Sequence, residues 1–219
     1  MVFETTKNDA IMNKRIIINV GRQVCAGGLE IGRLLADEFQ AKYYDRELLN
    51  LAAKESGFSE EYFKENDERK GFLRSFLHLP YSNNWGGGSN FYQNNFSQES
   101  LFKFQSDAII KAAQEGSCVF VGRCADYVLR DFDNVVNVFI TAPINVRAEL
   151  FMKEKDVSKE EAIKRIQQVE SRRASYYNYY TGKHWGQADS YDLCIDSGTI
   201  GSAETARLIA EFVRKKLNL

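Results

Sequence analysis

The sequence lacks the closely spaced cysteines and histidines that build metal sites or disulfide frameworks. It has four cysteines and two histidines in 219 residues, and no C-x-x-C motif. Zinc sites and disulfide-rich folds need such residues in regular spacing, so we expect neither. Isolated thiols are typical of a reducing compartment, and the sequence therefore predicts a cytoplasmic protein.

An excess of charge and a long apolar run are also missing. Lysine and arginine number 29 against 30 acidic residues, which gives a formal net charge of −1. Without an overall positive field we expect no binding to nucleic acid, and a phosphate group would have to be held by a local cluster of cations. The N-terminal residues stay polar until Ile16, which predicts a flexible tail over 1–14 and neither a signal peptide nor a membrane span.

Glycine, in contrast, is concentrated in one loop. Residues 16–20 predict a buried strand, residues 29–36 predict an amphipathic helix, and three glycines lie between them. Such a turn presents backbone N–H groups and the positive end of a helix dipole to an anion. The segment therefore predicts a phosphate-binding loop. Its predicted phosphate-binding residues are Gly21, Arg22, Cys25, Ala26, Gly27, Gly28 and Glu30.

This loop has no lysine, although the pattern G-x-x-x-x-G-K-[ST] requires one. Aligned on the helix, Gly28 stands in the place of the lysine, and Glu30 in the place of the Ser or Thr that binds Mg²⁺. A lysine about 4 Å from a phosphate is worth roughly 4 kcal/mol at an effective dielectric constant of about 20. We expect Arg22 to replace it in part, because a planar guanidinium can span two phosphate oxygens.

Glu30 allows two interpretations. It is either an oxygen ligand for Mg²⁺ or a first-turn acid that favours the helix dipole without any metal. The simplest alternative for the whole loop is a tight turn in which Glu30 and Gly27 form a capping box. For Cys25, its place at a helix N-terminus predicts a lowered pKa. Thiol-phosphatase chemistry is not expected, because the Cys-x5-Arg spacing would need arginine where Ile31 stands.

Strands and helices alternate along the rest of the chain, which predicts a parallel sheet with helices on both faces. The predicted strands are 16–20, 42–45, 118–121, 135–140 and 192–196. The predicted helices are 27–40, about 48–57 and 60–69, 98–115, 146–152, 158–174 and 202–217. In such sheets ligands bind beyond the carboxyl ends of the strands. Polar residues follow the strands: the glycine loop, Asp45, Arg123, Thr141 and Asp196.

Several stretches together resemble the cytidylate kinase-like family of the P-loop nucleoside monophosphate kinase group. They are Gly21–Glu30, Tyr44-Asp45, Gly122–Leu129, Asn145–Arg147, Arg172–Ala174 and Tyr176–Gly186. The resemblance implies an α/β fold, a P-loop NTPase-like three-layer sandwich with a five-stranded parallel sheet. It implies a single domain over 15–217, with a helical insert at about 58–100 and an arginine-bearing lid at about 155–190. An Asn- and Gly-rich segment at 82–97 belongs to the insert.

The resemblance also implies roles for individual residues. Gly122-Arg123 falls on a Gly-Arg-Asp motif whose arginine contacts the acceptor nucleotide, and Cys124 stands in place of its Asp. The implied acceptor-binding residues are Asp45, Arg123 and Asp126. The implied catalytic residues are Arg22, Asp45, Arg147, Arg172 and Arg173. The implied reaction is transfer of a phosphoryl group from ATP, with Mg²⁺, to a small acceptor such as CMP or another nucleoside monophosphate.

Other functions remain open at this point. A nucleotide-binding sensor or scaffold could keep the fold and lose turnover, which the missing lysine favours. A third alternative is binding of another anion, such as a sulfated or phosphorylated metabolite. The Tyr176–Tyr180 run either stacks on a base or packs the lid against the core. We expect a small-molecule nucleotide as ligand, and a homo-oligomer is compatible with the sequence.

Overall fold

The structure is a computed structural model that describes residues 15–45 and 91–219. The helices predicted at about 48–57 and 60–69, and most of the predicted insert, lie outside the described residues. The chain divides into two compact units, one of residues 1–46 with 109–219 and one of residues 47–108. The sheet and the candidate site lie in the first unit.

Five parallel strands form one sheet in the order β2-β3-β1-β4-β5, which confirms the predicted fold class. The strands are β1 (Ile17–Arg22), β2 (Lys42–Tyr44), β3 (Cys118–Val121), β4 (Val135–Thr141) and β5 (Leu193–Asp196). The first strand runs two residues further than predicted. Gly21 pairs with Phe139 and Arg22 with Ile140, so both belong to the sheet rather than to the loop.

The described helices follow the predicted order with different ends, and a short helix, α7, is added that was not predicted. They are α2 (Gly28–Glu38), α6 (Phe91–Glu115), α7 (Ala125–Val128), α8 (Ile144–Lys155), α9 (Lys159–Thr181) and α10 (Gly201–Leu217), with a 3-10 turn η2 (Ala188–Ser190). The start of α9 is fixed by Ser158, whose side chain accepts a hydrogen bond from the Glu161 amide. It ends at Gly182, which has the positive φ typical of a helix C-cap. This helix is longer than the predicted 158–174.

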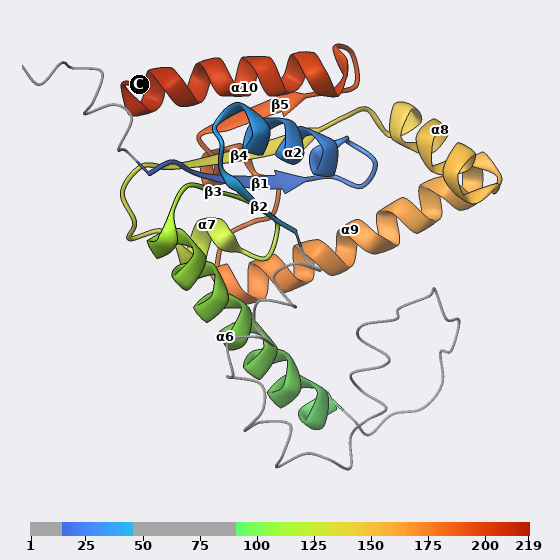
Figure 1. Ribbon diagram of the computed structural model, residues 1–219. Coiled ribbons are helices and arrows are strands. Elements are labelled where there is room, and N and C mark those ends of the chain that lie inside the picture. The colour runs from blue at the N-terminus through green and yellow to red at the C-terminus, as the bar shows by residue number, and fades with distance from the viewer. Residues whose placement is uncertain (1–14, 46–90) are drawn as a thin grey trace, which may run out of the picture. The chain divides into compact units, whose positions relative to one another are not determined.

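Helices α2 and α10 cover one face of the sheet, and α7 and the C-terminal part of α9 lie on the other side (Figure 1). The core between the sheet and the first pair contains Ile18 and Val20 of β1, Leu35 of α2 and Ile209 of α10. Every second residue of β1 therefore faces α2, and by this alternation Arg22 does so as well. Among the described residues, no helix is long and apolar enough to cross a membrane.

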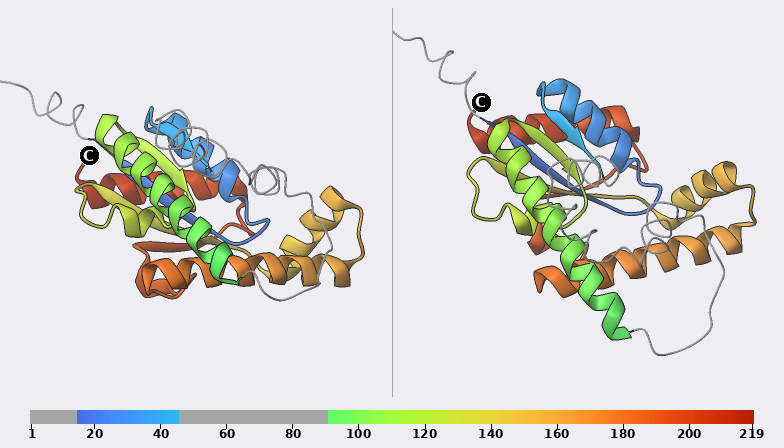
Figure 2. Two further views of the ribbon diagram at one scale, coloured as in Figure 1. Left: turned by 90° about the horizontal axis from the view of Figure 1, so that it is seen from below. Right: turned by 60° about the horizontal axis from the view of Figure 1, so that its bottom comes forward.

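Helices α8 and α9 form a hairpin beyond the carboxyl end of β1 (Figure 1), and both views of Figure 2 show the same turn between them. This end of the sheet is where ligands bind in open α/β folds. The predicted lid therefore lies at the edge where the predicted site residues follow their strands.

Candidate functional site

The loop between β1 and α2 contains a row of backbone amides without a described hydrogen-bond acceptor. Cys25 and Gly27 have positive φ values of 57° and 72°, which turn the chain into the helix. The first helical hydrogen bond of α2 runs from the Ile31 amide to the Gly27 carbonyl. In the described part of the chain, the amides of residues 25–30 donate to no acceptor. A run of such amides at a helix N-terminus is suited to an anion.

The neighbouring loop residues are held firmly by the protein. The Gln23 amide donates to the Ile140 carbonyl at 2.9 Å, and the Gln23 side-chain oxygen accepts from the Thr141 hydroxyl and from the Ala142 amide. The Ser197 hydroxyl donates to the Ala26 carbonyl at 2.9 Å. The loop is thus held by contacts of Gln23 and Ala26, while the amides of residues 25–30 have no acceptor among the described residues.

Arg22 crosses the first turn of α2 and reaches the end of β3. A Cβ atom on Gly28 would lie 2.6 Å from both Cβ and Cγ of Arg22, and one on Gly122 would lie 2.1 Å from Arg22 Nη1. Such distances are far below van der Waals contact, so both positions must be glycine for Arg22 to adopt this conformation. Gly28 is the residue aligned with the missing lysine. The Arg22 side chain occupies the space where a side chain at position 28 would lie.

Positive charge accumulates around the Arg22 guanidinium. The pKa of Arg22 is lowered to about 9, first by burial and then by the charges of Arg173 and Arg123, while Tyr43 and Asp45 act in the opposite direction. Within the described residues, this guanidinium makes no hydrogen bond or ion pair. Three cations near one point repel each other in a poorly solvated place, and a bound anion would relieve that repulsion.

Arg123 is held in an unusual turn directly after β3. Gly122, Arg123 and Cys124 have consecutive positive φ values of 82°, 65° and 55°. A left-handed conformation costs a non-glycine residue about 1–2 kcal/mol, and such conformations cluster at functional sites. The Arg123 guanidinium lies 6.0 Å from the centre of the Tyr176 ring of α9. This turn places Arg123 within electrostatic reach of Arg22.

Asp45 is an acidic residue at this edge. It follows β2, and its carboxylate lies 3.9 Å from the Arg33 guanidinium of α2. The pKa of Tyr43 is raised first by burial and then by the charge of Asp45, and the same charge acts on Arg22. The charges of Asp45, Arg123 and Arg173 all act on Arg22, so these four side chains lie near one another.

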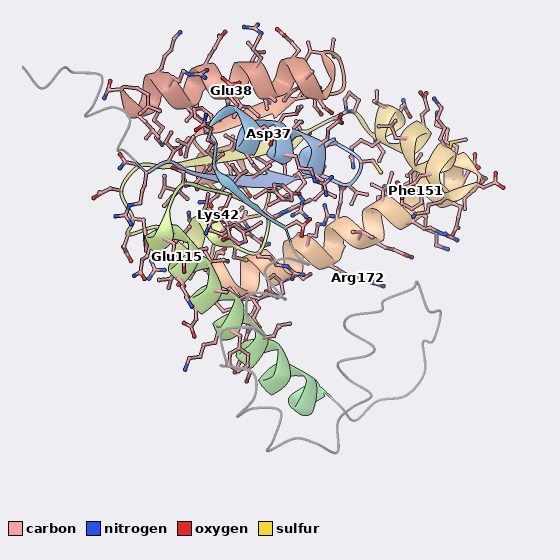
Figure 3. All side chains as sticks on the ribbon, in the orientation of Figure 1. Asp37, Glu38, Lys42, Glu115, Phe151 and Arg172 are labelled. Carbon is pink, nitrogen blue, oxygen red and sulfur yellow. The ribbon has the colours of Figure 1, made fainter. Side chains whose placement is uncertain are left out.

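The two lid arginines differ in position. Arg173 Nη1 donates to the Arg22 carbonyl at 3.1 Å, so it meets the loop. Arg172 lies on the exposed side of α9 (Figure 3). Consecutive helical residues point about 100° apart, and a helix cannot turn both side chains to one site. Of this predicted pair, the structure brings only Arg173 to the cluster.

Arg147 and Asp126 are each bound by a side chain of α9. Arg147 is buried, and its Nη1 lies 2.6 Å from a Glu170 carboxylate oxygen of α9. Asp126 is buried on α7 and accepts a hydrogen bond of 2.7 Å from the Tyr177 hydroxyl. Burial raises the pKa of Asp126, and the bond from Tyr177 opposes that shift. Both side chains are therefore buried with a protein partner, and their predicted roles toward phosphate and acceptor stay predictions.

The prediction for the Cys25 thiol is wrong in direction. Its pKa is raised, first by burial and then by the charge of Glu154, against the opposing charges of Arg147 and Arg173. Glu30 is exposed on the first turn of α2. The capping-box alternative is not seen, since the Gly27 amide donates to no described acceptor.

The tyrosines of the lid pack on protein groups. The rings of Tyr176 and Tyr180 lie 4.7 Å apart, and Tyr177 is buried with its ring stacked at 6.4 Å on Tyr191. These contacts agree with the packing alternative. Gln23 and Glu170 were missed by the sequence analysis. Glu170 stands three residues before Arg173, on the same helix face, and this spacing was the available signal.

A comparison with protein families decides the identity of this arrangement. A family model described as the cytidylate kinase-like family matches residues 17–199, which is most of the chain. The chain belongs to the cytidylate kinase-like family. The match includes the glycine loop, the turn at Arg123 and the whole of α9, so the site described above lies within the family's shared region.

Curated relatives cover a smaller part of this family member. A cytidylate kinase from Pyrococcus horikoshii is 37% identical over 89 residues, which are 40% of this chain and 45% of that protein. A cytidylate kinase from Methanopyrus kandleri is 30% identical over 107 residues, 45% of this chain and 55% of that protein. The chain thus spans about half the length of the curated relatives it matches.

Solved structures share the fold. An uncharacterized protein from Eubacterium ventriosum has a TM-score of 0.68 and 24% identity, and the match covers 92% of this chain and 99% of that one. A shikimate kinase from Bacteroides thetaiotaomicron has a TM-score of 0.51 and 11% identity, over 94% of this chain and 100% of that one. Both likenesses concern the fold alone.

Proposed function

We propose that this member of the cytidylate kinase-like family transfers a phosphoryl group from ATP to a small acceptor, a nucleoside monophosphate such as CMP. The observation that carries the proposal is the coincidence of two features at one edge of the sheet. Open amides at residues 25–30 lie beside a cluster of three arginines whose charges repel each other. Phosphoryl transfer needs mainly positioning and neutralisation of charge, and both features supply these.

The residues divide between donor and acceptor. The amides of residues 25–30 would bind the donor phosphates, with Arg22 and Arg173 neutralising the charge that develops during transfer. Arg123 and Asp45 would hold the acceptor, since they follow the two neighbouring strands β3 and β2. Asp45 would orient the acceptor hydroxyl or phosphate that receives the transferred group.

Magnesium fits this site through a single protein carboxylate. Among the described residues, no group of three or more His, Cys, Asp or Glu side chains lies together. Mg²⁺ is commonly held by one or two carboxylates together with phosphate oxygens and water. Glu30 is exposed beside the open amides and would be that carboxylate. Bound there, the ion would neutralise phosphate charge.

The test is a thermal-shift panel of nucleotides with and without Mg²⁺, followed by a coupled turnover assay on those that bind. We expect ATP to stabilise the protein and a nucleoside monophosphate to act as acceptor. Substitution Arg22→Ala should abolish most of the turnover. Absence of any nucleotide-dependent shift would contradict the proposal.

A second function is favoured by one specific observation. Gly28 stands where the P-loop lysine would be, and Leu29 follows it in place of a Ser or Thr. A nucleotide-binding sensor without turnover would need neither group. Stabilisation by ATP without turnover of any acceptor in the same assay would support this sensor and contradict the kinase.

A further inference from the structure

We propose that Glu170 and Arg147 are positioning residues that hold the phosphate loop in its anion-binding conformation and connect it to α9. Neither residue touches the open amides of residues 25–30. The inference about loop conformation stands on the structure alone. Only its consequence for ATP affinity rests on the proposed function.

One carboxylate oxygen of Glu170 binds both the phosphate loop and Arg147. Glu170 Oε1 accepts from the Val24 amide at 3.0 Å and from Arg147 Nη1 at 2.6 Å. Arg147 also reaches the loop, because its Nη1 lies 3.4 Å from the Val24 carbonyl. Its Nε donates to the Ala142 carbonyl at 2.7 Å, which anchors the guanidinium behind β4. The side chains of Arg147 and Glu170 are only 6% and 15% exposed.

The Val24 side chain is held by the same two helices. It packs against a small apolar cluster of Ala148 on α8 with Ala162 and Ile166 on α9. Val24 is therefore bound to the α8–α9 hairpin through its amide, its carbonyl and its side chain. Cys25, the next residue, begins the run of open amides. Fixing Val24 fixes the direction in which that run starts.

The positive charge of Arg147 compensates the negative charge of Glu170. A carboxylate so close to an anion site would repel a phosphate if its charge were not compensated. Arg147 compensates it at 2.6 Å, and Glu170 can then bind the Val24 amide without opposing the ligand. The family resemblance implies a catalytic role for Arg147. We propose instead that Arg147 is a positioning residue that acts through Glu170.

Stability and loop order can be separated by substitution. Removing one partner of a buried ion pair leaves a charge without compensation and is strongly destabilising. Replacing both partners by apolar residues of similar size is often neutral for stability. In the double variant Arg147→Met/Glu170→Leu, however, the Val24 amide still loses its acceptor. Loop order should then be lost while the melting temperature recovers.

The experiment compares this double variant, both single variants and the parent protein. The matched control is Glu161→Leu/Arg165→Met, which removes a more exposed ion pair of 2.6 Å on the same helix. The readouts are the melting temperature, hydrogen exchange of a peptide covering residues 21–28, and ATP affinity. We expect both single variants to melt lower and the double variant to regain the parent's melting temperature.

In the double variant, exchange in residues 21–28 should rise and ATP affinity should fall, each about 5- to 10-fold, as expected for loss of one buried hydrogen bond. The control should match the parent in both. Unchanged exchange in the double variant would overturn the inference. A double variant as unstable as the single ones would also overturn it, since the pair would then serve folding. Faster exchange in a protein that never binds ATP would keep the inference and refute the proposed function.

Discussion

At the scale of single residues, the positive charge of the site comes from Arg22 at the end of β1, whereas a P-loop lysine would stand at position 28, at the start of α2. Any side chain at position 28 would place its Cβ 2.6 Å from Arg22 Cβ and Cγ. A lysine at 28 and an arginine at 22 in its present conformation therefore exclude each other. Gly122 extends the same path, because its lack of a side chain makes room for Arg22 Nη1.

Arg22→Ala should weaken ATP binding about 10- to 100-fold, since a hydrogen bond to a charged group contributes about 1.5–3 kcal/mol. The melting temperature of the free protein should stay equal or rise, because the variant relieves repulsion with Arg123 and Arg173. Titration calorimetry measures the affinity. Arg172→Ala, one position from Arg173 but exposed, is the control and should bind ATP like the parent. Equal affinity in the two variants would contradict the role of Arg22.

Gly28→Ala should displace Arg22 and reduce ATP affinity, although alanine favours a helix over glycine by about 1 kcal/mol. The exchange Arg22→Gly/Gly28→Lys should recover part of the affinity, because the lysine then has free space. Gly116→Ala is the control, since a Cβ there would meet nothing within 4 Å. If Gly28→Ala binds ATP as tightly as the parent protein, Arg22 does not need to pass Gly28 in order to bind the nucleotide.

At the scale of elements, the strands that are buried on both faces could be predicted from the sequence. The strands at β1, β3 and β4 are apolar runs because a parallel sheet is covered on both faces. The end of β1 could not be predicted, since Gly21 and Arg22 suit a loop as well as a strand. Only pairing with Phe139 and Ile140 of β4 decides it. The four-residue helix α7 is too short for a periodic pattern.

The sequence predicted where the site lies, but only some of the residues that form it. Strand ends predicted that Asp45 and Arg123 would gather near the glycine loop. The choice between Arg172 and Arg173 depends on the rotation of α9, and the pairing of Arg147 depends on Glu170 in another helix. Contacts between helices leave no trace in local sequence patterns, so these residues needed the structure.

The contact between α7 and α9 should make stability depend on pH. Burial raises the pKa of Asp126 above its ordinary value of 3.8, so the folded state holds its proton more tightly than the unfolded state. Stability contributed by protonated Asp126 is therefore lost as pH rises from about 4 towards neutral. Asp126→Asn should raise the melting temperature at pH 7 by about 2–4 °C, with a smaller difference at pH 4.

Thermal melts at both pH values check this prediction. Tyr177→Phe is the complementary variant, because it removes the hydroxyl that donates to the Asp126 carboxylate at 2.7 Å. It should lower the melting temperature at pH 7. A parent protein more stable than Asp126→Asn at pH 7 would show that the ionised carboxylate is favoured instead.

At the scale of the whole molecule, the formal charge of −1 conceals a local concentration of positive charge. Arg22, Arg123 and Arg173 come from β1, the turn after β3, and α9, so the complete tertiary fold is needed to bring them together. The same fold keeps the amides of residues 25–30 open. An anion that binds this place should stabilise the entire domain.

Inorganic phosphate should therefore raise the melting temperature more than chloride does at equal ionic strength, since an anion that binds only the folded state stabilises it by mass action. Arg22→Ala should lose most of that difference. Thermal shift in matched salts measures it. An equal effect of both salts on the parent protein would count against an anion site.

A crystal structure of the protein with Mg²⁺ and a non-hydrolysable ATP analogue would show where the phosphates bind. We expect phosphate oxygens within hydrogen-bonding distance of amides in residues 25–30, and the Arg22 guanidinium in contact with one of them. Phosphates bound away from these amides, or Arg22 turned away from them, would contradict this expectation.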